Sequence, residues 1–181
     1  MVLAIMASVT HGTTMVPIDA YSPVKVMKAI QQEKCTACHG VPTMFIAMLD
    51  HPDFKQYDFS TMRTGIMAGS PCPVPVMRQV VEEMNMRDIT IVYGLTETSP
   101  GCTQPRTDES LALRVSTVAR NLPFIDCKFL DSETRKEVTA GNPGEFCARG
   151  YTVMKGYSKM DEYITEAFDK EVLMHVRARL T

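Results

Sequence analysis

The strongest constraint on the fold of this chain is the alternation of two apolar patterns along its first half. Four short apolar runs, each bounded by turn residues, are typical of buried strands. The segments between them carry apolar residues at helical spacing. This alternation predicts a parallel sheet with helices on both faces, because parallel neighbours need a crossover connection. The predicted strands are residues 13–18, 35–39, 63–68 and 89–93.

The ends of the predicted helices carry recognisable signals. Ser22 and Pro23 suit the N-cap and the first turn of a helix, on which Val24, Met27 and Ile30 form one apolar stripe. Further helices are expected to begin at Pro42 and near Pro75. Residues 1–11 are interpreted as the end of a buried helix that Gly12 terminates.

The pattern changes after residue 100. Residues 101–110 form a polar loop, and strand-like segments follow at 125–130 and 146–149. We therefore predict an α/β part over residues 1–115 and a small antiparallel β subdomain over residues 116–170. The latter would include an exposed helix at 161–170, and residues 171–181 are assigned as a divergent tail.

Composition narrows the functional class. The 181 residues are 45% hydrophobic and 22% charged with a net charge of −2, as expected for one globular domain. The chain has no basic stripe for nucleic acid and no apolar run of about 18 residues for a membrane span. No basic residue precedes Lys25, so residues 1–9 match neither a secretory signal nor a transit peptide. We expect an intracellular enzyme domain with reduced cysteines.

The segment Cys35-Thr36-Ala37-Cys38-His39 has the spacing of a c-type haem attachment site. Haem attachment needs an exported chain, and a zinc site needs a fourth ligand that the other histidines do not supply at a suitable spacing. We therefore interpret the match as a coincidence within a strand.

The richest candidate site follows the strand at residues 89–93. Tyr93 offers a flat ring for stacking, Gly94 permits a tight turn, and Thr96 and Thr98 supply hydroxyl groups. Glu97 supplies a hard oxygen ligand suited to Mg²⁺. These residue types suit a nucleotide with its metal, whereas the alternative is an ordinary polar turn after a buried strand.

A second loop of small residues is expected at the same edge. Gly69, Ser70 and Pro71 follow the strand at 63–68, which one helix separates from the strand at 89–93. Ligands of open α/β sheets bind outside the carboxyl ends of the strands. The two loops are therefore predicted to form two walls of one site.

Residues 93–100, Tyr-Gly-Leu-Thr-Glu-Thr-Ser-Pro, resemble the Tyr-Gly-x-Thr-Glu motif of the AMP-forming adenylating enzymes. Residues 68–71 resemble the adenine loop of that family. Residues 144–150, 154–157 and 165–169 resemble its later Gly-Glu, Met-x-Gly-Tyr and Thr-x-x-Ala-Phe-Asp segments. The likeness is greatest to the medium-chain fatty acyl-CoA synthetases grouped as acyl-CoA synthetase family member 2.

The resemblance implies a fold, a reaction and residue roles. The chain would be a fragment of the large N-terminal domain, a partly parallel doubly wound sheet. It would use ATP, Mg²⁺ and CoA to convert a fatty acid to its acyl-adenylate and then to its thioester. Tyr93 would stack on adenine, in a pocket lined by Gly69, Ser70 and Pro71. Thr96 would bind the phosphates, Glu97 would hold Mg²⁺, and the acyl group would lie near Gly94 and Leu95.

Departures from the family pattern limit this expectation. The upstream phosphate loop and the C-terminal domain with its lysine have no counterpart here. Ala119 replaces a glycine, and residues 171–175 replace a segment that holds the ribose. We therefore expect this chain alone to be inactive, as a fragment or as a truncated isoform that binds nucleotide or a partner. An unrelated α/β binding module is the third class. Known members of the group that the chain resembles are mitochondrial, although no targeting segment is expected in this chain.

Overall fold

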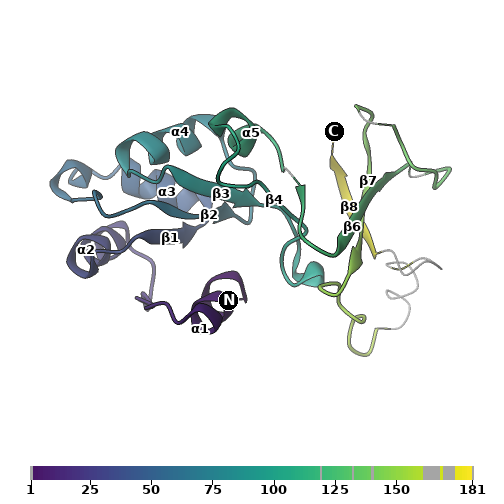
Figure 1. Ribbon diagram of the computed structural model, residues 1–181, viewed down its shortest axis with the longest axis horizontal. Helices are drawn as coiled ribbons and strands as arrows, with labels where there is room; N and C mark the ends of the chain where they lie inside the picture. The colour runs from purple at the N-terminus through teal and green to yellow at the C-terminus, as the bar shows by residue number, and fades with distance from the viewer. Residues whose placement is uncertain are drawn as a thin grey trace. The chain divides into compact units, whose positions relative to one another are not determined.

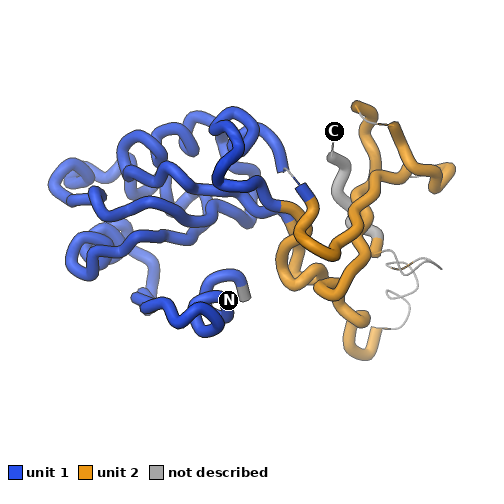
Figure 2. The backbone as a smooth tube through the Cα atoms, in the orientation of Figure 1, with its two compact units in different colours: residues 1–93, 104–120 blue, residues 94–103, 121–181 orange. Residues whose placement is uncertain are grey.

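The structure is a computed structural model that describes residues 2–118, 120–131, 133–139, 141–160, 168 and 174–180. The chain divides into two compact units, which Figure 2 shows in blue and orange. Unit 1 comprises residues 1–93 and 104–120, and unit 2 comprises residues 94–103 and 121–181. This division differs from the predicted one because it groups residues 94–103 with the C-terminal strands.

Unit 1 is built on a parallel sheet of three strands, in the order β1-β2-β3 (Figure 1). The strands are β1 Ala37–Gly40, β2 Thr64–Ala68 and β3 Asp88–Val92. Parallel pairing places Gly40 beside Met67 and Ala68 beside Val92. All three strands therefore end at the same edge of the sheet, as the alternating pattern predicted.

Four helices pack in a row along unit 1, α2 on α3, α3 on α4 and α4 on α5. Proline stands at the first or second position of α2, α3 and α4, where its missing N–H leaves no helical bond unmade. The helices are α2 Pro23–Glu33, α3 Pro42–Leu49, α4 Val74–Glu83 and α5 Leu111–Ser116.

A methionine-rich core lies between these helices and the sheet. It includes the side chains of Met27, Phe45, Met67 and Met77, all fully buried. On β2, Met67 is buried and its neighbour Ile66 is half buried, as expected for alternating faces of a strand. The apolar stripes read from the sequence therefore supply the core, except that Val24 of α2 is exposed.

Helix α5 is anchored by a buried arginine. The guanidinium of Arg114 donates to the carbonyl oxygens of Ile89 and Arg87, each at 2.8 Å, and to that of Glu109 at 3.1 Å. Three carbonyl acceptors offset the cost of burying this cation, which would be large without partners. Arg114 thus holds α5 against β3, the strand that Tyr93 directly follows.

The N-terminal segment departs from the prediction. Residues Val2–Met6 form a π-helix and Ala7–His11 form α1, which ends at Gly12 with a left-handed φ of 63° as predicted. However, the side chains of Ile5 and Val9 are 46% and 64% exposed, so this helix is not buried. Residues 13–18 form no strand and pair with no other described segment.

Unit 2 contains an antiparallel sheet in the order β6-β7-β8. The strands are β6 Ile125–Leu130, β7 Gly144–Gly150 and β8 Met174–Leu180. No strand is predicted in the tail at 171–181, yet most of the tail is β8, which pairs with β7. The short strands β4 Thr103–Gln104 and β5 Arg120–Asn121 pair with each other where the chain passes between the units.

Some sequence predictions fall on residues outside the described ranges. These are the helix at 161–170 apart from Phe168, the family-like segment at 165–169 apart from the same residue, and the departures at Ala119 and at 171–173. Among the described residues, no helix combines the length and apolarity needed to cross a membrane.

Candidate functional site

The first part of the candidate site lies in unit 1, where β2 and β3 end side by side. Since Ala68 pairs with Val92, the next residues, Gly69 and Tyr93, leave the sheet at the same edge. Gly69 has a φ of +92°, which a residue with a Cβ adopts only with strain. Ser70 and Pro71 are exposed, and the Tyr93 side chain is half buried. The structure thus brings together four of the residues predicted from the sequence.

The loop after β2 is held by local contacts. The thiol of Cys72 donates to the carbonyl oxygens of Met67, at 3.3 Å, and Ser70, at 3.5 Å. Burial raises the pKa of the Cys72 thiol to about 11, which keeps it protonated and able to donate at neutral pH. Helix α4 begins two residues later, at Val74.

The remaining predicted residues, Gly94 to Glu97, belong to unit 2. A Cβ on Gly94 would clash with the carbonyl oxygen of Pro100 and lie 2.5 Å from the Cα of Gly101. Only glycine permits this close approach of two backbone segments. Leu95 is extended and leads into a short 3-10 helix, Thr96–Thr98.

Thr98 closes this turn from inside. Its side chain is fully buried, and its hydroxyl accepts from the Leu95 N–H at 3.0 Å and donates to the Leu95 carbonyl at 3.1 Å. Thr96, at the start of the turn, is exposed. The turn therefore presents Thr96 to the surface while Thr98 holds its backbone.

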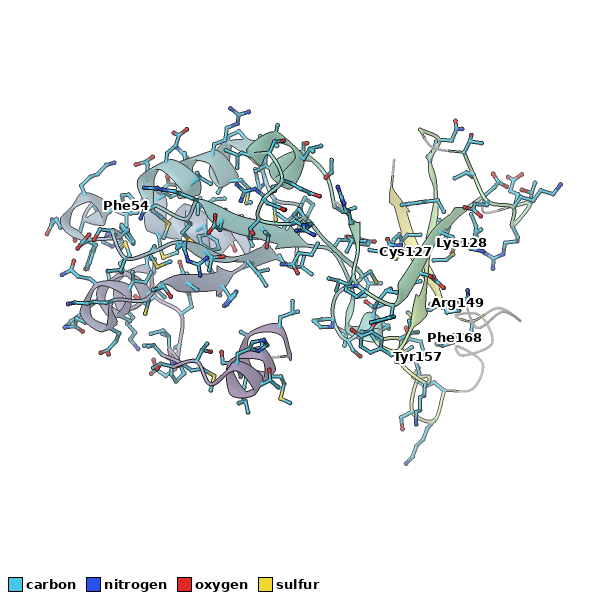
Figure 3. The ribbon with its side chains drawn as sticks, viewed as in Figure 1. Phe54, Cys127, Lys128, Arg149, Tyr157 and Phe168 are labelled. Carbon is cyan, nitrogen blue, oxygen red and sulfur yellow. The ribbon has the colours of Figure 1, made fainter. Side chains whose placement is uncertain are left out.

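Glu97 is held from a distant part of the chain. The hydroxyl of Tyr157 donates to Glu97 Oε1 at 3.0 Å, and the Met154 N–H donates to the Glu97 carbonyl at 2.8 Å. Tyr157 lies in the segment after β7 and is labelled in Figure 3. Residues 154–157 resemble a segment of the family, but no role for Tyr157 could be predicted, because spacing alone does not show that it meets Glu97.

The donor set around Glu97 can be compared with the needs of a cation. Within the described residues, no group of three or more His, Cys, Asp or Glu side chains could hold a metal ion by itself. Mg²⁺ usually takes one or two protein carboxylates and fills its other positions with water and substrate phosphates. A single half-buried carboxylate next to an exposed threonine fits a Mg²⁺ ion that arrives with a nucleotide.

The Cys35–His39 segment has a different arrangement. Cys38 and His39 are consecutive residues of β1, so their side chains point to opposite faces of the sheet. Cys35 and Cys38 pack against the core of unit 1, and burial raises the pKa of Cys38 to about 12. Packing against the core therefore accounts for the presence of Cys35 and Cys38 without a bound haem or zinc.

The sequence model of one protein family, described as "AMP-binding enzyme", matches residues 1–158. The chain belongs to the AMP-binding enzymes. It is 52% identical over 170 residues to YngI of Bacillus subtilis (strain 168), which carries the name of an acyl-CoA synthetase. It is 44% identical over 168 residues to the acyl-CoA ligase sidI of Aspergillus fumigatus and 39% identical over 153 residues to the mitochondrial medium-chain acyl-CoA ligase ACSF2 of Rattus norvegicus.

This chain spans only part of its relatives. The three alignments cover 94%, 92% and 84% of the chain but 31%, 28% and 25% of the respective relatives. Among solved structures, ATP-bound MatB of Rhodopseudomonas palustris superposes with a TM-score of 0.84 at 24% identity, over 98% of this chain and 34% of MatB. The adenylating-enzyme fold predicted from the motifs is therefore confirmed.

Proposed function

We propose that this chain supplies part of the nucleotide site of an ATP-dependent, AMP-forming acyl-CoA ligase. The observation that carries the proposal is the placement of Glu97. Its carboxylate follows an exposed threonine in a tight turn, and a tyrosine hydroxyl and a backbone N–H hold the residue at two points. The names of the relatives, which are acyl-CoA ligases, support the same reaction class.

The proposed roles in unit 1 concern the base of the nucleotide. Gly69, Ser70 and Pro71 would line the adenine pocket, and Tyr93 would stack on the ring. The shared edge of β2 and β3 supports this assignment, because ligands of α/β sheets bind outside the carboxyl ends of the strands.

The proposed roles in unit 2 concern the phosphates and the acyl group. Thr96 would donate its hydroxyl to a phosphate oxygen, and Glu97 would hold Mg²⁺. Mg²⁺ held there would supply positive charge to the phosphates. The acyl carboxylate would form a bond to the α-phosphate, and the bond from the α-phosphate to the β-phosphate would break, so that pyrophosphate leaves. Gly94 and Leu95 would border the acyl group.

The proposal for the substrates has a general part and a more specific part. ATP, CoA and a carboxylic acid follow from the reaction class, and a medium-chain fatty acid is the finer proposal, supported by the ACSF2 relative. A mitochondrial location rests on the name of that relative alone, since YngI comes from a bacterium.

The coverage of the relatives favours a second candidate. Because the chain spans 25% to 31% of them, it can hold part of a site without completing the reaction. In that case the chain would bind nucleotide, or a partner, without turnover.

Two measurements on the 181-residue chain test the proposal. The first is a thermal melt with Mg-ATP or with a non-hydrolysable acyl-adenylate analogue. We expect the midpoint to rise, because a ligand that binds only the folded state stabilises it. Tyr93→Ala and Glu97→Ala should reduce this rise. If both variants respond like the parent chain, the proposed nucleotide site is refuted.

The second measurement is pyrophosphate release from ATP in the presence of octanoate. Release that Glu97→Ala abolishes would establish ligase chemistry in this chain. A ligand-dependent melt without any release would instead establish the binding-only candidate.

A further inference from the structure

The segment Met154–Tyr157 of unit 2 holds Glu97 in place, but the proposed function gives its side chains no role of their own in cation binding. It contacts Glu97 at both its backbone and its side chain, although Tyr157 lies 60 residues away in the sequence. Both side chains are half buried. Two contacts from one short segment restrict the position and the rotation of the Glu97 carboxylate.

The backbone before Tyr157 is shaped for this contact. Gly156 has a φ of +147°, a conformation that favours glycine, and it directly precedes Tyr157. The Met154 N–H fixes the segment against the Glu97 carbonyl at 2.8 Å. The phenol ring moves through only two torsions, so a fixed backbone also restricts its hydroxyl.

The hydrogen bond leaves part of the carboxylate available. Tyr157 donates to Oε1, at 3.0 Å, and a carboxylate accepts at two oxygens with about four lone-pair sites. With Oε1 engaged, the carboxylate no longer rotates freely, and Oε2 keeps a defined direction. Groups that hydrogen-bond a metal ligand in this way orient it, and their loss costs about 10- to 100-fold in metal affinity.

We propose that Tyr157 is a positioning residue that orients the Glu97 carboxylate for a divalent cation bound with nucleotide. This inference rests on the proposed function, in which Glu97 holds the cation. Tyr157 acts through Glu97 and contacts neither nucleotide nor cation in this proposal.

The test uses Mn²⁺ in place of Mg²⁺, together with a non-hydrolysable imido analogue of ATP. Electron paramagnetic resonance measures the Mn²⁺ affinity of the complex, and calorimetry in EDTA measures nucleotide affinity without metal. We expect Tyr157→Phe, which keeps the ring, to weaken Mn²⁺ binding about 10-fold and to leave metal-free nucleotide binding unchanged. Tyr151→Phe is the matched control, because Tyr151 is 75% exposed, and it should change neither affinity.

Glu97→Gln separates the two proposals. If it leaves Mn²⁺ affinity unchanged, the role of Glu97 in the proposed function is refuted. If it weakens Mn²⁺ binding while Tyr157→Phe does not, only the positioning role is refuted. In the double variant, Tyr157→Phe should add no loss to that of Glu97→Gln, whereas a general structural role would reduce affinity in both backgrounds and contradict the inference.

Discussion

The loops that follow β2 and β3 begin at the same edge of one sheet but are stabilised in different ways. The loop after β2 depends on local features, namely the positive φ of Gly69, the proline at 71, and thiol contacts within five residues. The loop after β3 has a local bond between Thr98 and Leu95, but it also depends on residues further along the chain. Gly94 meets Pro100 and Gly101, and Glu97 is held from residues 154 and 157.

This difference indicates how each loop should respond to change. A loop fixed by its own sequence tolerates disturbance elsewhere, whereas a loop fixed by distant contacts fails when any of those contacts is lost. The contacts that position Thr96 and Glu97 are made mostly within unit 2, by residues that lie elsewhere in the sequence. Local sequence patterns therefore carry little information about these contacts.

The largest effect is expected for Gly94→Ala. The new methyl group would overlap the Pro100 carbonyl oxygen, and the clash is with backbone, which cannot rotate away. Overpacking of this kind costs about 3 kcal/mol. Hydrogen exchange should show faster exchange throughout residues 94–103, and urea denaturation should show the loss of stability.

Gly69→Ala is the matched control for that variant. Its new methyl group would meet only Val41 Cγ1, at 3.2 Å, and the positive φ would add strain. We expect a cost of about 1 to 2 kcal/mol, confined to the loop after β2. Equal losses for the two glycine variants would contradict the distinction between the loops.

An intermediate effect is expected for Thr98→Val, which keeps the shape of the side chain but removes its hydroxyl. The partly buried Leu95 N–H would lose its acceptor, at a cost of about 1 to 2 kcal/mol in the free energy of unfolding. Urea denaturation measures the difference.

Thr103→Val provides the comparison. Thr103 is also buried in unit 2, but its hydroxyl has no hydrogen-bond partner within the described part of the chain. Its replacement should be neutral or stabilising, since no bond is lost and a buried polar group is removed. A larger loss for Thr103→Val than for Thr98→Val would show that the hydroxyl of Thr98 does not hold the turn.

The smallest effect on stability is expected in a test of Cys72 that measures the reactivity of its thiol and substitutes no residue. Burial raises its pKa to about 11 from the ordinary value near 9, so less thiolate is present at any lower pH. At pH 8 alkylation by iodoacetamide should be roughly 100-fold slower than for an ordinary thiol and should rise until about pH 11. Peptide mass spectrometry measures the rate, and the urea-unfolded chain is the control. A midpoint near pH 9 in the folded chain would mean that the loop after β2 does not bury this thiol.

The elements predicted most accurately are those with a local signature. Strand β6 was predicted at its observed bounds, and the helices predicted to begin at Pro42 and near Pro75 begin at Pro42 and Val74. Gly12 ends α1 as predicted. In each case the signal is a short-range preference, such as the strand-like composition of β6, proline at a helix start or glycine in a left-handed turn.

The elements that were predicted wrongly or missed are those that depend on partners. Residues 13–18 have a strand-like composition but no neighbouring strand to pair with in the described chain, and β8 is defined mainly by its pairing with β7. Helix α5 has only six residues and few local signals. Its Ser110 cap accepts from the Leu113 N–H at 3.4 Å, and its Arg114 is buried. A polar residue in a short segment gives no sign that it will be buried.

Local sequence patterns predicted the order of β1, α3, β2, α4 and β3, the shared edge at which Gly69 and Tyr93 leave the sheet, and the family. These predictions follow from periodicity, turn chemistry and motif order, which act over a few residues. The contact of Tyr157 with Glu97, the approach of Gly94 to Pro100 and the exposure of α1 could be learned from the folded structure alone. Such contacts join residues that sequence patterns treat as independent, and they form only when the intervening chain has packed.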